Sequence, residues 1–80
     1  MPRFYLHVWK DDIFVEDPDG GDFLTVEAAR DEALVAAREI MSEQVRLGEL
    51  PEPTDRFEIT DNDGHLVLTV SFYEALARRS

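Results

Sequence analysis

The chain has 80 residues, 44% of them hydrophobic and none of them cysteine, and its formal net charge is −10. This length predicts a single domain over residues 1–80, and the hydrophobic fraction is typical of a globular protein rather than a disordered one. The lack of cysteine excludes disulfides and thiolate metal sites. Because phosphate binding needs clustered positive charge, eight scattered lysines and arginines among eighteen acidic residues argue against a nucleic-acid partner.

No stretch approaches the roughly 20 apolar residues of a membrane span. Asp11 and Asp12 end the first apolar run too early for a signal peptide. We therefore expect a cytoplasmic protein without membrane contact. Its excess of negative charge leaves a basic protein partner possible.

The first predicted strand, residues 3–9, is apolar on both faces. Successive side chains of a strand point to opposite faces, so the even-numbered and odd-numbered residues form two sets. These sets are Phe4, Leu6 and Val8 on one side and Tyr5, His7 and Trp9 on the other. We expect the even set to lie in the core beneath a helix and the odd set to lie on the open face of the sheet.

A turn at residues 10–12 and a short strand at 13–15 follow, which indicates a hairpin. Residues 17–22, Asp-Pro-Asp-Gly-Gly-Asp, form the clearest loop signal of the chain. A long helix is expected between Thr25, a good N-cap, and Gly48, a typical exit residue. At 1.5 Å per residue it would be roughly 33 Å long, so its C-terminal turns should overhang the sheet. Its predicted buried stripe is Val26, Ala29, Ala33, Ala37, Ile40, Gln44 and Leu47, with Leu34 and Met41 beside it.

Two further strands, residues 56–61 and 65–70, alternate around Asn62-Asp63-Gly64, which suits a type I turn closed by a glycine bulge. The segment Ser71-Phe72-Tyr73-Glu74 matches a capping box and predicts a short helix through Ala77. The predicted apolar set of the two strands is Phe57, Ile59, Leu66, Leu68 and Val70.

The fold class expected from this order, β-β-α-β-β-α, is α+β: an antiparallel sheet of about four strands with one long helix packed on one face. A right-handed crossover gives the strand order 2-1-3-4, in which every neighbouring pair is antiparallel. The order 2-1-4-3, with strands one and four parallel, is the alternative.

Several segments are similar to a known family: the start M-P-R-F-Y-L-H-V, the D-P-D-G turn, the helix E-A-A-R-D-E-A-L-V-A-A-R-E, and R-F-E-I-T-D-N-D-G-H-L-V-L-T-V-S-F-Y-E-A-L. Over Met1 to Leu76 the chain resembles a family of small bacterial proteins known as domain of unknown function 6894. The resemblance implies a stand-alone domain with no assigned activity or cofactor, and it carries over no catalytic residue.

The open face of the sheet is the first candidate site. Tyrosine, tryptophan and arginine are enriched at binding hot spots, whereas aromatic sheets that bind RNA have a basic surround that is missing here. A core of this size rarely supplies more than about 3–5 kcal/mol, so without disulfides self-association is the stabiliser that remains. We therefore predict a homodimer through this face or a strand edge, unless the rings pair within the monomer or the terminal helix folds over them. The candidate interaction surface is Arg3, Tyr5, His7, Trp9, Phe14, His65 and Val67.

Histidine chemistry is the second candidate. His7 or His65, with Glu58 or Glu16 nearby, could form a general base or part of a metal site. No nucleophile or third ligand stands at a diagnostic spacing, so we expect no enzyme, no catalytic or metal residue and no cofactor. A small-ligand or metal-dependent activity centred on His7 and an acidic neighbour is the runner-up function.

Calcium is the third candidate, since aspartates cluster in residues 17–22 and 61–63. Neither loop fits an EF-hand: Asp22 and Leu66 occupy the position that requires glycine, and Ala28 and Phe72 the position that requires glutamate. We predict that these aspartates form turns by accepting hydrogen bonds from their own backbone.

Overall fold

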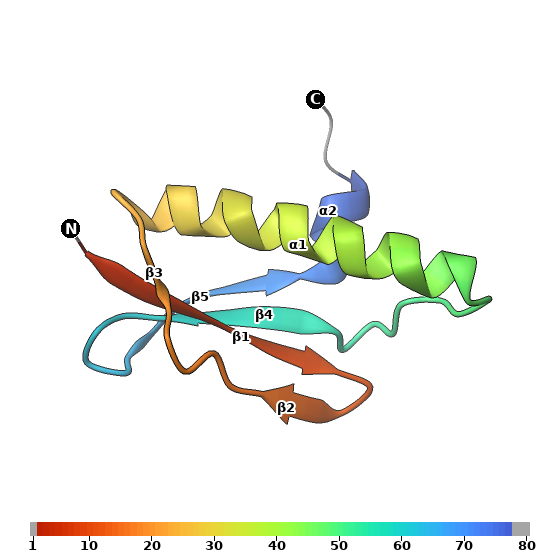
Figure 1. The fold of residues 1–80 in the computed structure, drawn as a ribbon, viewed down its shortest axis with the longest axis horizontal. Coiled ribbons are helices and arrows are strands. Elements are labelled where there is room, and N and C mark those ends of the chain that lie inside the picture. Colours follow the sequence, from red (N-terminus) through yellow and green to blue (C-terminus); the bar gives the residue numbers. More distant parts are fainter. Residues whose placement is uncertain (1, 78–80) are drawn as a thin grey trace.

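The computed structural model describes residues 2–77 and consists of a twisted antiparallel sheet with a helical layer on one face (Figure 1). The sheet follows the path β2-β1-β4-β5, and a fifth strand, β3, also pairs with β1. The elements in chain order are β1 (Arg3–Lys10), β2 (Ile13–Val15), β3 (Gly21–Asp22), α1 (Val26–Arg46), β4 (Arg56–Thr60), β5 (Leu66–Ser71) and α2 (Phe72–Ala77). The α+β class and the predicted antiparallel strand order are confirmed, and the alternative with a parallel pair is wrong. Within residues 2–77, neither helix combines the length and apolarity that crossing a membrane would require.

The strand count was underestimated because β3 lies inside the segment that the sequence indicated as a loop. β3 pairs Asp22 with Arg3 and Gly21 with Phe4. Gly20 makes this return possible: its φ is +67°, and a Cβ there would lie 2.8 Å from the Phe4 carbonyl oxygen. A strand this short has no periodicity for a sequence pattern to reveal.

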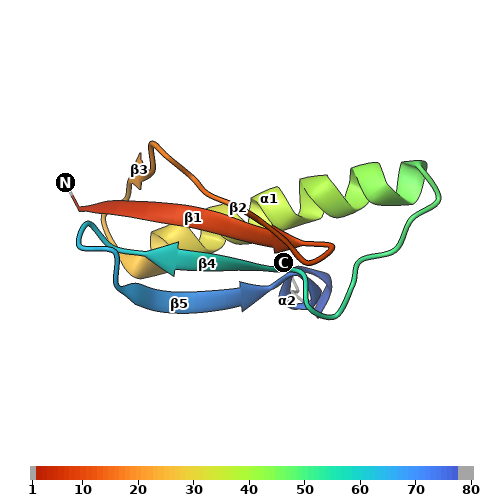
Figure 2. The ribbon, with the colours of Figure 1, turned by 90° about the horizontal axis from the view of Figure 1, so that it is seen from below.

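The helix α1 begins and ends as its caps predicted. The hydroxyl of Thr25 accepts the N–H of Ala28 at 3.1 Å, and Gly48 leaves the helix with φ +80°. The helix buries Ala29, Ala33, Leu34, Ala37, Met41 and Gln44. Leu47 was wrongly placed on this stripe, since it is 63% exposed. The reason is the predicted overhang, which is confirmed: the last turns of α1 extend beyond the sheet (Figure 2).

The core lies between α1 and the inner face of the sheet. Phe4, Leu6 and Val8 pack against it, as predicted, together with the buried Ile59 and Val70. Leu66 was expected in this set but is 56% exposed. A β-bulge causes the difference: Ile59 pairs with Leu68 but Thr60 pairs with Leu66, so Val67 has no partner on β4.

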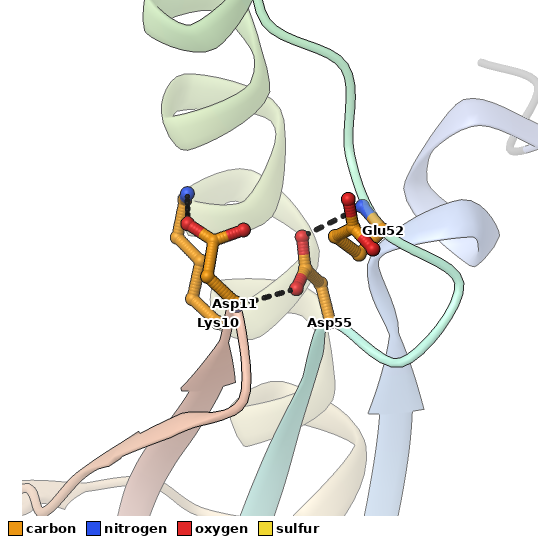
Figure 3. Close-up of polar contacts among 4 residues, drawn as sticks. All are labelled: Lys10, Asp11, Glu52 and Asp55. Carbon is orange, nitrogen blue, oxygen red and sulfur yellow. Dashed lines mark hydrogen bonds and ion pairs between the residues drawn. The ribbon is translucent and has the colours of Figure 1, made fainter.

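A buried carboxylate joins the β1–β2 turn to the segment before β4. Asp55 is fully buried, and its two oxygens accept the backbone N–H of Asp11 at 3.0 Å and of Glu52 at 2.9 Å (Figure 3). In the turn itself, Asp11 and Asp12 have φ of +54° and +63°, as a type I′ hairpin turn requires. At the start of this turn, Lys10 donates a hydrogen bond to the Asp11 carboxylate, and this bond raises the pKa of Lys10.

The capping box of α2 is confirmed. The N–H of Ser71 donates to Glu74 at 2.9 Å, and the N–H of Tyr73 donates to the Ser71 hydroxyl at 3.2 Å. Glu74 also forms an ion pair with Arg30 of α1 at 3.0 Å. Phe72 and Ala75 of α2 are buried in the core, so α2 lies in the helical layer and does not fold over the open face (Figure 1).

Candidate functional site

The outer face of the sheet is the side turned away from α1, and no described element covers it (Figure 2). Its members follow from the strand register, because directly paired residues share a face. We define the outer face as Arg3, Tyr5, His7, Trp9, Phe14, Asp22, Arg56, Glu58, Thr60, Leu66, Thr69 and Ser71. The predicted odd-numbered set of β1 therefore lies where the sequence placed it.

Aromatic rings form a continuous row across this face. Tyr5 stacks on His7 with centroids 6.2 Å apart, and Phe14 lies 5.5 Å from His7 and 5.0 Å from Trp9. The guanidinium of Arg56 lies 5.1 Å from the centre of the Trp9 ring. The rings cover one another, so the β1 aromatics are half-buried, and the most exposed apolar side chains of the face lie at its two sides.

The charges of the outer face cancel. Arg3 forms an ion pair with Asp22 at 3.2 Å, and Arg56 with Glu58 at 3.4 Å. Two arginines and two carboxylates leave the strand residues of the face neutral on a chain whose net charge is −10, and the nearest further carboxylates, Glu16, Asp17 and Asp61, line the pocket beside His7. The negative charge is therefore carried elsewhere, on the loops and on α1.

His7 is engaged at both ring nitrogens. The backbone N–H of Asp17 donates to Nδ1 at 3.0 Å, and Nε2 lies 3.1 Å from the Thr60 hydroxyl. Because a backbone N–H can only donate, Nδ1 must carry its lone pair, and the neutral ring then has its hydrogen on Nε2. Neither nitrogen is free to take a proton from a substrate or to bind a metal without breaking one of these contacts.

Asp17 anchors the loop beside His7. Its carboxylate accepts the N–H of Leu6 at 3.1 Å and of Gly20 at 3.1 Å. The bond from Leu6 satisfies a backbone N–H of β1 that lies between the residues paired with β2 and those paired with β3. The bond from Gly20 confirms the prediction that Asp17 forms a turn with its own backbone. Between this loop and the 60–64 turn lies a pocket of about 210 Å³ whose lining includes His7 and Glu16.

Two residues of the predicted surface lie at irregular positions. His65 precedes β5 and sits in the turn, with a side chain 77% exposed and 3.7 Å from Asp61. Val67 is 42% exposed and has no partner on β4, because the bulge pairs Leu66 with Thr60 of the outer face. The bulge therefore adds Leu66, which strict alternation assigns to the inner face.

The turn also brings His65 close to two aspartates that the sequence indicated only as turn formers. Ligand atoms of Asp61, Asp63 and His65 lie within 4.8 Å of one another, an arrangement that could hold a divalent cation. One Asp61 oxygen already accepts the N–H groups of His65 and Asp63, and these bonds, that of His65 first, lower the pKa of Asp61. The D-x-D-x-H spacing was the available sequence signal.

Comparison with known proteins gives one match. The family model described as Domain of unknown function (DUF6894) matches residues 3–73. No curated protein matches the chain, and no solved structure does.

Proposed function

We propose that this chain, which belongs to the DUF6894 family, is a cytoplasmic, non-enzymatic module that self-associates through its outer face. The observation that carries the proposal is the pairing of two properties on one surface. The face is uncovered and aromatic, and its strand residues carry no net charge on a strongly acidic molecule. Two copies can therefore approach through it with less repulsion than through any loop-bearing side.

The apolar content of the face favours a protein partner. Phe14 is 43% and Leu66 56% exposed, at the two sides of the half-buried row that contains Tyr5 and Trp9. Large aromatic side chains with an arginine above one of them are the composition of interface centres. Cross-strand pairing has already ordered these rings, so little side-chain entropy remains to be lost on association.

The test is the molar mass of the purified chain by light scattering on a size-exclusion column, up to high micromolar concentration. We expect twice the 9.2 kDa of one chain. Leu66→Glu should give monomers, since losing the burial of a leucine costs about 1.5–3 kcal/mol, or about tenfold or more in Kd. Trp9→Ala should act in the same direction.

Val35→Glu is the matched control. Val35 is 44% exposed on α1, so this variant adds the same charge away from the outer face. It should remain a dimer. A monomeric wild-type chain, or equal effects of Leu66→Glu and Val35→Glu, would refute self-association through this face.

The pocket beside His7 supports a second candidate, a small-ligand activity with Glu16 as the acidic neighbour. The two functions make opposite demands on the same strand. If His7→Ala abolishes an activity while Trp9→Ala spares it, the second candidate is right. If Trp9→Ala gives a monomer by light scattering while His7→Ala remains a dimer, the first candidate is supported.

A further inference from the structure

The strand β2 is apolar and exposed throughout. Ile13, Phe14 and Val15 are 64%, 43% and 54% exposed. β2 lies farthest from α1, so the helix does not cover the inner side of this strand (Figure 1). Consecutive exposed apolar residues on a strand are costly in water and typically serve a contact.

One edge of β2 has no strand beside it among the described residues. The direction of its backbone groups follows from Leu6, whose N–H points to Asp17 on the β2 side of β1. Backbone groups alternate along a strand, so Val8 and Lys10 also point toward β2. Their partners Val15 and Ile13 point back, which leaves the N–H and C=O of Phe14 directed outward.

Acidic residues lie on both sides of this short apolar strand. Asp11 and Asp12 precede it, and Glu16 and Asp17 follow it. If a second copy of β2 paired antiparallel about Phe14, Asp12 of one copy would lie beside Glu16 of the other. Like charges at such positions oppose the pairing, whereas basic residues on the incoming strand would favour it.

We propose that the β2 edge binds an extended segment of a partner protein whose apolar residues are flanked by lysine or arginine. The segment adds as a strand, its backbone pairs with the N–H and C=O of Phe14, and its apolar side chains cover Ile13 and Val15. Its basic flanks meet Asp12 and Glu16. This inference does not depend on self-association: the outer face presents the Phe14 side chain, whereas the β2 edge presents the Phe14 backbone and the side chains of Ile13 and Val15.

The probe is a labelled synthetic peptide, Lys-Lys-Val-Ile-Val-Lys-Lys, titrated with the full chain and followed by fluorescence anisotropy. Its matched controls are Glu-Glu-Val-Ile-Val-Glu-Glu and the basic peptide with an N-methylated central isoleucine. We expect Kd to rise at least about tenfold for either control, and to rise in about 1 M salt, where the Debye length is near 3 Å. The Glu16→Gln variant should also bind the basic peptide more weakly.

Amide resonances locate the contact. On adding the basic peptide, the N–H of Phe14 should shift most, while that of Val15, which already pairs with β1, should shift less. No binding at about 1 mM peptide, equal binding of the acidic peptide, or shifts confined to outer-face residues other than Phe14 would overturn the proposal. A Phe14 shift that appears on concentrating the Leu66→Glu variant alone would also overturn it, because a second copy would then occupy the edge without association through the outer face. The light-scattering comparison of the Leu66→Glu variant with the wild-type chain tests self-association separately, so either proposal can fail while the other holds.

Discussion

Removing the Asp55 carboxylate should cost this domain a large part of its stability. The side chain is fully buried and accepts two backbone N–H groups, from Asp11 in the β1–β2 turn and from Glu52 before β4. Asp55→Ala leaves both donors without their acceptor and loosens two segments far apart in the sequence. Asp55→Asn keeps one acceptor oxygen but turns an N–H₂ group toward the second donor.

The magnitude follows from these two bonds. A hydrogen bond to a charged group contributes about 1.5–3 kcal/mol, and water can reach Asp11 and Glu52, which favours the lower end. We therefore expect Asp55→Ala to lose about 3 kcal/mol of the roughly 4–12 kcal/mol typical of 80 residues. Asp55→Asn should lose about 2 kcal/mol. At about 4–8 °C per kcal/mol, the alanine variant should melt more than about 10 °C lower.

Urea unfolding followed by far-UV circular dichroism measures these losses. Asp12→Asn is the control: Asp12 is exposed and asparagine tolerates its positive φ, so the change should stay within about 0.5 kcal/mol. If Asp55→Ala lost no more than this control, the carboxylate would not hold the two segments together, and the reasoning would be wrong.

Three further predictions concern the backbone, a cap and acid stability. Gly20→Ala should lower the free energy of unfolding, measured in thermal melts, by at least about 1 kcal/mol more than Gly64→Ala. Both positions need positive φ, but only a Cβ at Gly20 would meet other atoms. Equal losses of stability in the two variants would contradict this. Glu74→Ala should lose about 1 kcal/mol in urea unfolding. Glu74→Gln should lose less, since its amide can still accept the Ser71 N–H; no difference between the two would show that the cap is inert. The lowered pKa of Asp61 adds stability above the ordinary value of 3.8, which is lost as the pH falls through the lower folded-state pKa. Between neutral and acid pH, the free energy of unfolding should therefore decrease less for Asp61→Asn than for the wild-type chain. Equal decreases in the two proteins would contradict this prediction.

The resemblance to the DUF6894 family and the α+β order both followed from local patterns. Period-two alternation identified β1 and its two faces, and residues within a few positions of one another set the caps of α1 and α2. Each of these signals arises from neighbours in the chain, so the sequence alone suffices to read it.

The candidate site was predictable only in part. Tyr5, His7 and Trp9 lie on the predicted face, but their half-burial depends on Phe14 and Arg56, which arrive from other strands. The exposure of the whole of β2 also depends on where α1 crosses the sheet, which no local pattern states.

The pairing register of the strands determined the remaining features of the candidate site. The bulge in β5 moves Leu66 outward and leaves Val67 unpaired, and the two nitrogens of His7 are occupied by Asp17 and Thr60, which lie 10 and 53 residues away. Such contacts form only when distant strands align, and a shift of a single residue changes which face a side chain occupies. Local patterns thus determined the main elements and the two faces of β1, whereas the packing of distant segments determined β3, the face of Leu66 and which groups remain free to bind.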